Sequence, residues 1–327
     1  MGLKIKSFVY RVIDILMIPF AFFIARFSKL LRTNHFQDFP ITKKIFFWIG
    51  VYPIKDHYYD PLFNLKYLKY SLRKDRTLPG INLNNEEQLE ILNNFNYSGE
   101  LSTFPRKPAD KNKKYEYCYS DEAFMSADSE FLYSIIRYFK PQKIVEIGCG
   151  LSTLMARNAI EKNINEEASY HCNHICIEPF ENKWLEDLNI TIVRKMVEEV
   201  DIDLFKSLNN DDILFTDSSH IIRPQGDVLF EYLSILPVLK PGVFVHVHDI
   251  FTPKDYLNEW LEIGYLWNEQ YLLEAFLTHN KEFRIIGALN YLFHHFKEQL
   301  TQKFPVIKEE VEQGIYREPG SFWMVKN

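Results

Sequence analysis

A short apolar run that ends at a glycine turn constrains the fold of this chain more than any other feature. The run is Lys143–Ile147, and the turn after it reads Gly148-Cys149-Gly150. Glycine adopts backbone angles that other residues avoid, and it lets a ligand approach the main chain closely. A helical pattern begins near Ser152. The run, the turn and the helix predict a parallel sheet that binds a nucleotide-like ligand at its edge.

Two acids indicate what that ligand is. Glu178 ends the next apolar run, residues 174–177, and a carboxylate at that point accepts two hydrogen bonds from ribose hydroxyls. Glu146 lies just before the turn, where its negative charge repels a pyrophosphate and favours a cationic ligand. S-adenosylmethionine (SAM) carries a ribose, an ammonium and a sulfonium. It is therefore the ligand that this pattern favours.

These residues resemble those of a known family. The motif Glu146-Ile147-Gly148-Cys149-Gly150, with Glu178 and the block Asp217-Ser218-Ser219-His220, is similar to class I SAM-dependent methyltransferases. The closer resemblance is to the subgroup with Asp-x-x-His after its fourth strand, which includes sugar O-methyltransferases of antibiotic biosynthesis. It covers about residues 128–325 and implies an α/β fold, a Rossmann-like sheet with helices on both faces. The implied cofactor contacts are Glu146, Gly148, Cys149, Gly150, Ser152, Thr153, Glu178 and Asp217.

Two other classes of protein stay open. The chain departs from the resembled family at Ser152, where many members carry a third glycine. A nicotinamide-dependent oxidoreductase needs glycine at the position of Thr153, and Glu146 disfavours its pyrophosphate. A non-catalytic SAM-fold binding protein would keep the glycine turn without needing polar residues after the later strands. Such residues are present, which favours an enzyme.

Helical and strand-like patterns alternate after residue 126, which predicts a parallel α/β sheet. Helices are expected at 128–139, with Ser126 or Asp128 as N-cap, and around 228–236. The last two runs would close the sheet as a strand pair, with a helical excursion between them at 291–313. The expected strands are Lys143–Ile147, 174–177, 190–193, Ile213–Thr216, 243–247, Phe283–Ala288 and 321–325.

Polar side chains follow the fourth and fifth strands at the point where each strand ends. Asp217 and His220 follow the fourth, and His248 and Asp249 follow the fifth. Because these strands are neighbours in the resembled fold, we expect the four side chains to share one crevice. Asp217, His248 and Asp249 are then candidate ligands for Mg²⁺ or another divalent cation. His220 is a candidate general base, with a structural hydrogen bond as its alternative.

Two other groups of residues have ligand types that could bind a metal. His246 and His248 lie on one face of the fifth strand, and with Asp249 they would make a two-histidine, one-carboxylate iron site. Such a site would leave the SAM-like turn without a role. The run from His171 to Cys176 suits zinc by residue type. It leads into a buried strand, and no second ligand pair with matching spacing accompanies it.

Composition limits the remaining possibilities. A net charge of −6 disfavours a general nucleic-acid binder. Four cysteines in 327 residues are too few for a disulfide framework, which indicates a reducing, cytoplasmic compartment. The aromatic share of 16% indicates extensive apolar packing, or contact with carbohydrate or a membrane surface.

Residues 1–35 differ from the rest of the chain, because basic residues flank an apolar centre. The uncharged run at 15–25 is shorter than a bilayer requires, and Pro19 would kink a helix there. No small-x-small cleavage site follows, so a signal peptide is disfavoured. The pattern predicts a helix on an anionic membrane surface, at the inner face. The alternatives are packing on the chain's own core or on a second copy, and insertion.

Two further segments have open interpretations. The predicted accessory region, residues 36–125, contains a helix at 84–95, an exposed loop near 105–114 and the polar-aromatic string at 55–60. That string would either line an acceptor pocket or form an ordinary loop. Residues 251–271 would form an aromatic lid over the acceptor or pack as a plain helix. The third region, residues 126–327, is the expected methyltransferase domain, with a glycan or other small molecule as acceptor.

Overall fold

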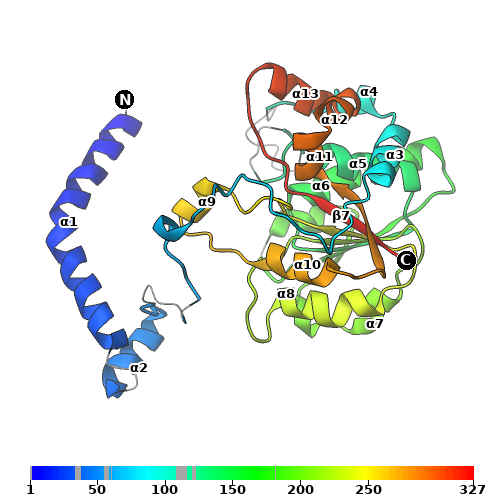
Figure 1. Ribbon diagram of the computed structural model, residues 1–327. Helices are drawn as coiled ribbons and strands as arrows, with labels where there is room; N and C mark the ends of the chain where they lie inside the picture. The colour runs from blue at the N-terminus through cyan, green and yellow to red at the C-terminus, as the bar shows by residue number, and fades with distance from the viewer. Residues whose placement is uncertain are drawn as a thin grey trace. The chain divides into compact units, whose positions relative to one another are not determined.

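The computed structural model describes residues 2–33, 38–54, 59, 61–107, 116–119, 123–180 and 182–327 (Figure 1). The chain divides into two compact units, Met1–Ser71 and Leu72–Asn327, which are described separately. The division falls inside the predicted accessory region 36–125 rather than at either of its ends. Of the polar-aromatic string at 55–60, only Tyr59 is among the described residues. Residues 108–115 of the predicted loop also lie outside them.

The larger unit is built on a seven-stranded sheet in the order β3-β2-β1-β4-β5-β7-β6. Strands β1 to β5 are parallel, and β7 runs antiparallel between β5 and β6. The predicted strands and the closing strand pair are confirmed, with ends that shift by no more than one residue. The strands are β1 (Lys143–Ile147), β2 (Asn173–Ile177), β3 (Thr191–Val193), β4 (Ile213–Thr216), β5 (Phe244–Val247), β6 (Phe283–Ala288) and β7 (Phe322–Lys326).

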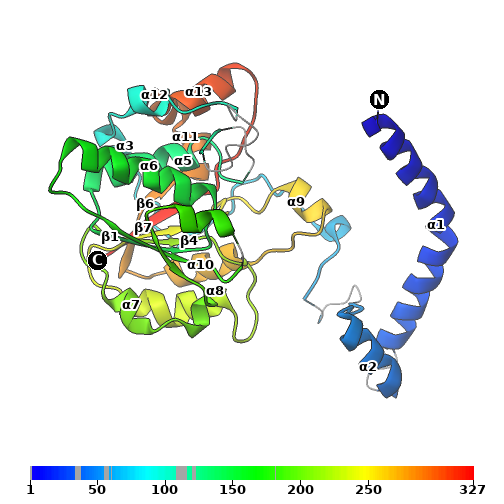
Figure 2. The same cartoon turned by 180° about the vertical axis from the view of Figure 1, so that it is seen from behind.

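Helices cover both faces of the sheet, as the resemblance implies (Figures 1 and 2). On one face lie α3 (Asn85–Asn94), α4 (Ser98–Leu101), α5 (Asp128–Phe139), α6 (Leu151–Glu166), α11 (Leu289–His295), α12 (Lys297–Lys303) and α13 (Pro305–Glu312). The last three are the helical excursion predicted between the final two strands. On the other face lie α7 (Ile202–Lys206), α8 (Asp227–Phe230) and α10 (Glu269–Leu277). A π-helical turn, Glu231–Ile235, and a 3₁₀ turn, Leu236–Val238, extend α8, so the helix predicted around 228–236 is present in mixed form.

The shorter elements connect this framework. They are α9 (Asn258–Glu262) and the 3₁₀ helices Lys183–Asp187 and Val197–Glu199; a further 3₁₀ helix, Leu65–Tyr67, belongs to the smaller unit. Each face of the sheet has its own apolar core. Phe131 and Trp323 are fully buried on the α5 side, and Leu214 and Val245 are fully buried on the α8 side. Side chains of successive strand residues point to opposite faces, and because both faces are covered, every residue of β4 and β5 is buried.

The predicted N-cap of α5 is wrong. Ala127 occupies the N-cap position, and the Glu130 carboxylate accepts a hydrogen bond from the Ala127 backbone N–H at 3.0 Å. Asp128 instead accepts hydrogen bonds from the backbone N–H groups of Gly320 and Ser321, at 3.1 and 2.8 Å. The carboxylate that sequence rules assign to a local cap therefore fixes the segment before β7, almost two hundred residues away.

Glu130 makes a second long-range connection. Its carboxylate also accepts hydrogen bonds from the backbone N–H groups of Val306 and Ile307, at 2.8 and 3.1 Å. These donors belong to the first turn of α13, which has no intrahelical acceptors for them. Burial raises the pKa of Glu130 to about 7, although the three N–H donors oppose that rise. One side chain thus satisfies the ends of two helices.

Residues 72–107 belong to the larger unit, where they contact α10 and β6. Arg76 forms an ion pair with Glu274 of α10, with Nη1 to Oε2 at 2.6 Å. The Gln88 side-chain oxygen on α3 accepts a hydrogen bond from the Ala288 backbone N–H at the end of β6. The carboxyl-terminal part of the predicted accessory region therefore borders the outer strand β6.

The smaller unit contains α1 (Gly2–Thr33) and α2 (Pro40–Ile49). Helix α1 continues across Pro19, and most of its apolar side chains are exposed. Within the described residues, the stretch Phe8–Arg32 is long and apolar enough to cross a membrane by length and composition, with a mean hydropathy of 2.0. The uncharged run at 15–25 is by itself too short to cross a membrane, and the sequence prediction depended on that run. The helix extends beyond the run at both ends.

Candidate functional site

The glycine turn brings the ends of β1 and β4 into direct contact. Gly148 has a φ of +78°, in the left-handed region that favours glycine. A Cβ atom placed on Gly148 would lie 1.9 Å from the Asp217 carbonyl oxygen. The Asp217 backbone N–H donates to the Ile147 carbonyl at 2.9 Å, and the Gly148 N–H donates to Ile177 at 3.1 Å. The predicted cofactor turn and the predicted catalytic aspartate are thus neighbours through their main chains.

The second glycine of the turn leaves open space instead. A Cβ atom on Gly150 would meet no other atom within 4 Å. The Gly150 N–H donates to the Thr153 hydroxyl oxygen at 3.1 Å, so Thr153 caps the turn where a dinucleotide-binding protein would have glycine. Helix α6 starts at Leu151, and its first N–H groups point toward this space. The turn therefore offers room and backbone donors at the edge of the sheet.

Glu178 holds the turn from the neighbouring strand. Its carboxylate accepts hydrogen bonds from the Cys149 N–H at 3.2 Å and from the Phe180 N–H at 2.9 Å. The residue is 7% exposed. A carboxylate oxygen has two lone pairs, so each oxygen of Glu178 keeps capacity for a ribose hydroxyl. The structure brings together Gly148, Cys149, Gly150 and Glu178, as the sequence predicts.

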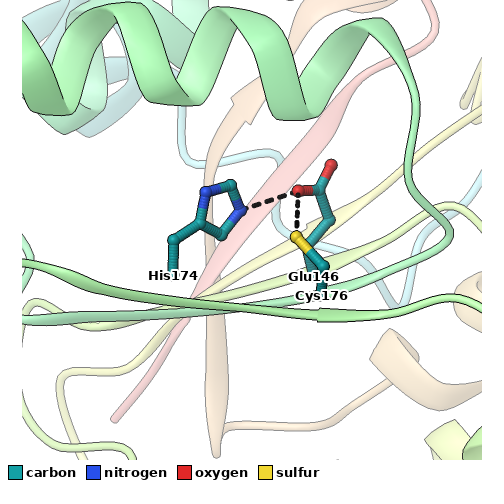
Figure 3. Close-up of side chains that lie close together, drawn as sticks. All are labelled: Glu146, His174 and Cys176. Atoms are coloured by element: carbon teal, nitrogen blue, oxygen red, sulfur yellow. Dashed lines mark hydrogen bonds and ion pairs between the residues drawn. The ribbon is translucent and has the colours of Figure 1, made fainter. Parts of the chain in front are cut away.

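Glu146 has a different environment from the one expected. Figure 3 shows it with His174 and Cys176 on one face of the sheet, below a helix. The Ser152 hydroxyl donates to Glu146 Oε1 at 2.7 Å, and His174 Nε2 lies 2.7 Å from Oε2. The Cys176 thiol donates to the same Oε2 at 3.6 Å. Glu146 is only 2% exposed, so its carboxylate supports the start of α6 rather than facing open space.

A second polar cluster lies at the ends of β4 and β5. His220 Nε2 is 3.3 Å from Asp217 Oδ1 and 3.4 Å from Asp249 Oδ2. One donor atom from each of these three residues lies within 4.8 Å of the others. His220 and Asp249 both have positive φ, at 59° and 57°. Non-glycine residues in this conformation carry backbone strain, which is common at functional sites.

Sequence reasoning missed one member of this cluster, Glu269. Its Oε2 lies 2.9 Å from His220 Nδ1, and the residue is 1% exposed. The N–H groups of Asn268 and Glu269 also donate to the His220 carbonyl, at 3.1 and 3.2 Å. Glu269 is therefore placed to fix the imidazole orientation, as a carboxylate does for many catalytic or metal-binding histidines. The signal available was an acid in the first turn of an otherwise apolar helix.

The carboxylates control the charge of His220. Burial lowers its pKa, but Asp217, Glu269 and Asp249 together raise that pKa well above the usual value. Burial likewise raises the pKa of Asp217, whereas His248 and His220 lower it below the usual value overall. The three acids therefore favour the protonated form of His220. A nearby positive charge would oppose them and favour the neutral imidazole, which is the form that acts as a base.

The two histidines near the end of β5 have different environments. His248 follows the strand, its Nε2 lies 3.6 Å from Asp249 Oδ1, and its ring packs on Phe124. The donor atoms within 4.8 Å of one another belong to Asp217, His220 and Asp249, and His248 adjoins this group through Asp249, so its ligand role stays a prediction. His246 is fully buried, lies 3.0 Å from the Ser321 hydroxyl and stacks on a phenylalanine ring. Its place in the core disfavours the two-histidine iron site.

A hollow of about 1070 Å³ opens beside Asp249 and His248. Trp260, Tyr265 and Trp267 line it, and the last two rings stack with their centroids 5.0 Å apart. The Trp267 ring also lies 4.5 Å from the His220 ring. The segment 251–271, predicted as a lid or a plain helix, has two parts in the structure. Its aromatic part forms a wall of the hollow, and the following helix α10 packs on the core.

Part of the chain is similar in sequence to known proteins. Residues 145–250 match the family model described as a methyltransferase domain, a stretch that runs from β1 to just beyond β5. An uncharacterized protein of Archaeoglobus fulgidus is 29% identical over 183 residues, which cover 52% of this chain and 80% of the relative.

One solved structure gives a partial overlap. It is described as a Plasmodium falciparum protein-L-isoaspartate O-methyltransferase in complex with S-adenosyl-L-homocysteine. The TM-score is 0.27 at 9% identity, with 49% of this chain and 83% of that chain covered. The assignment of the fold therefore rests on the strand order and on the two helical layers.

Alanine substitutions at the two glycines of the turn should differ in their effect on stability. Gly148→Ala should lower the free energy of unfolding by more than about 1 kcal/mol, because the new Cβ meets the Asp217 carbonyl at positive φ. Gly150→Ala should cost less, because its Cβ meets no atom. Denaturant unfolding of both variants, without ligand, measures the difference. Equal losses would contradict the close contact between the turn and β4.

Proposed function

We propose that this chain is a SAM-dependent methyltransferase that acts on a hydroxyl of a sugar, a glycan or another small molecule. The observation that carries the proposal is the direct contact between Gly148 and Asp217, which joins the glycine turn to the polar cluster of Asp217, His220 and Asp249. Both parts lie in the stretch that matches a methyltransferase domain.

The turn is the proposed cofactor site. Glu178 would accept hydrogen bonds from the ribose hydroxyls, and the open space at Gly150 would receive the amino-acid part of SAM. The sulfonium methyl would then lie toward the cluster after β4. Methyl transfer to oxygen is an in-line displacement, so the main requirement is that the acceptor oxygen is held behind the methyl group.

The hollow beside Asp249 is the proposed acceptor site. Its wall of Trp260, Tyr265 and Trp267 presents flat apolar rings, on which the faces of a sugar ring can pack. Asp249 and His248 supply polar atoms on the same lining. This combination of aromatic faces and hydrogen-bonding groups supports a hydroxyl-bearing acceptor. It also keeps water away from the transfer site.

The carboxylates of Asp217 and Asp249, which lie within 4.8 Å of each other, suit a divalent cation of the Mg²⁺ type. When bound, such an ion would orient acceptor hydroxyls and would offset the negative charge around His220. Glu269 would keep the Nδ1–H of His220 occupied, which leaves Nε2 as the atom that accepts the hydroxyl proton. His220 is thus the proposed base, and Glu269 is its positioning residue.

Titration calorimetry with SAM on the full chain tests the cofactor. Glu178→Ala should weaken SAM binding by about tenfold or more, because two ribose hydrogen bonds are lost. Asp187→Ala is the matched control, since Asp187 is an exposed acid on the same connection between β2 and β3. Undiminished affinity in Glu178→Ala would disprove the cofactor site. A preference for NAD over SAM would instead indicate an oxidoreductase, and SAM binding without turnover on any hydroxyl acceptor would indicate a binding protein.

The proposed base predicts a specific loss of turnover. His220→Ala should lower kcat by about 10²–10⁴, the range for a lost acid–base group, while SAM affinity is kept. Chelation with EDTA should abolish activity, and Mg²⁺ or Mn²⁺ should restore it. Full activity in EDTA would exclude the cation but leave the base. Full activity of His220→Ala would exclude the base and leave catalysis by positioning alone.

Glu269→Gln separates a positioning role from simple packing. Deprotonated His220 is the active form, so kcat should rise with pH through its pKa. Glu269 raises that pKa, and its replacement by neutral glutamine should shift the rising limb to lower pH. The pH profile of kcat in saturating Mg²⁺ measures this shift. Loss of activity with an unmoved limb would show that Glu269 only supports the fold.

We also propose that α1 attaches the chain to an anionic membrane surface. Arg11 and Lys29 are eighteen residues apart, as are Asp14 and Arg32, which is five full helical turns. These four charged side chains therefore share one face, Arg26 lies at its edge, and exposed apolar side chains such as Phe23 occupy most of the remaining surface. A narrow, mainly basic face on an apolar helix is typical of helices that lie in the headgroup region. Such attachment would give access to a lipid-linked or envelope glycan.

Liposome flotation tests the membrane proposal. Arg11→Glu with Lys29→Glu should reduce binding to phosphatidylglycerol vesicles, because basic residues contribute about 1 kcal/mol each near an anionic surface. Lys240→Glu with Lys308→Glu makes the same charge change on the larger unit and should leave binding unchanged. Removal of residues 1–35 should release the protein while SAM binding is kept. Resistance to an alkaline wash would show insertion, and absence of binding to anionic vesicles at low salt would show packing.

A further inference from the structure

Three potential metal ligands lie together under the glycine turn, and a fourth adjoins them: donor atoms of Glu146, His174 and Cys176 lie within 4.8 Å of one another, and Cys149 packs beside Cys176. We define the subturn cluster as Glu146 of β1, Cys149 of the turn, and His174 and Cys176 of β2. His174 Nε2 and Cys176 Sγ lie 2.7 and 3.6 Å from the same Glu146 oxygen (Figure 3). Glu146 and Cys176 are also direct partners across the β1–β2 pairing. Cys149 packs on Cys176 in a small buried cluster with Leu185.

The chemistry of these donors differs from that of the site after β4. Two thiols, an imidazole and a carboxylate are the ligand types of tetrahedral zinc, whereas Mg²⁺ prefers oxygen. All four residues are buried, with Cys149 the most exposed at 9%. Closed sites with four protein ligands are typical of structural zinc. The methyl transfer proposed above does not require sulfur ligands, so the cluster has no part in that chemistry.

The burial of the cluster favours a cation. Glu146 and His174 are almost completely buried, and one Glu146 oxygen faces both the imidazole and the Cys176 thiol. A thiolate is the form of cysteine that binds a metal. Without an ion, the four groups have to share protons in a dry interior, where unbalanced charge is costly.

We propose that Glu146, Cys149, His174 and Cys176 bind Zn²⁺. Binding requires both cysteines as thiolates and His174 as a neutral imidazole, so each proton that these groups carry passes to solvent; no electron transfer is involved. The run His171–Cys176 had indicated zinc by residue type but lacked a second ligand pair. The fold supplies that pair from β1 and its turn. Within the run, only His174 and Cys176 contribute, because His171 is exposed and Cys172 lies on another part of the core.

The ion would join β1, the turn and β2 directly beneath the proposed cofactor site. Cys149 donates its backbone N–H to Glu178, so a metal bond to its sulfur would fix the turn from below. This consequence for SAM binding rests on the proposed function. The metal site itself does not, since it is defined by its own side chains.

Cobalt substitution on the wild-type full chain is the decisive experiment. The metal-free protein, loaded with one equivalent of Co²⁺, should show the near-ultraviolet charge-transfer absorption of a thiolate–cobalt bond and the visible bands of tetrahedral Co²⁺. Zn²⁺ should then displace both signals. The cluster of Asp217, His220 and Asp249 contains no sulfur and cannot give the charge-transfer band. Absence of the charge-transfer band would overturn the proposal and would leave the subturn cluster as a hydrogen-bonded network without a metal.

Two cysteine variants provide the matched comparison. Cys176→Ser should lose the charge-transfer band or reduce it by about half, and should lose one equivalent of bound zinc on metal analysis. Cys172→Ser, four positions earlier on the chain, should keep both. Retention of zinc in Cys176→Ser would contradict the proposal. If Cys176→Ser does not fold, the wild-type cobalt spectrum decides. Zinc binding in a protein that does not bind SAM would support the metal site and disprove the proposed function separately.

Discussion

The approach of Gly148 to the Asp217 carbonyl is the contact on which the site depends. No side chain fits between these two points, since even a Cβ would lie 1.9 Å from the oxygen. The ends of β1 and β4 therefore meet through their main chains. This fixes the distance between the glycine turn, which has space for a ligand, and the acids that follow β4 and β5. In the proposed reaction, a methyl donor and an acceptor hydroxyl would have to meet within a few ångströms, and this contact would set that spacing.

Buried carboxylates carry much of the long-range organisation around that contact. Glu130 joins the start of α5 to the start of α13, and Asp128 holds the segment before β7. Glu178 holds the turn, and Glu269 holds His220. An ionised carboxylate accepts several hydrogen bonds at once, which makes it an effective partner for backbone N–H groups that lack one. These carboxylates also place negative charge in the interior. The effect is clearest after β4, where three carboxylates surround His220.

The sequence predicts the sheet well because its signals are local. Lys143–Ile147 and Ile213–Thr216 have the predicted ends, since each is a short apolar run bounded by polar residues or glycine. The site is predicted only in part. Glu269 contacts His220 from forty-nine positions away, and no spacing rule connects two residues at that distance. The close approach of His220 to Asp217 and Asp249 was also not specified by spacing, because backbone turns after the strands decide which side chains converge.

The two clusters beside the glycine turn differ in exposure as well as in ligand type, and this difference separates their proposed roles. The Asp217 side chain is 31% exposed, so the cluster after β4 has an accessible side toward a substrate. Glu146 and His174 are almost completely buried, which prevents any substrate from reaching the subturn cluster. A reacting group needs an open position, whereas a structural ion needs a closed one. The exposure of the first cluster therefore suits its proposed role in chemistry on an acceptor, and the burial of the second suits its proposed role as a structural metal site beneath the turn.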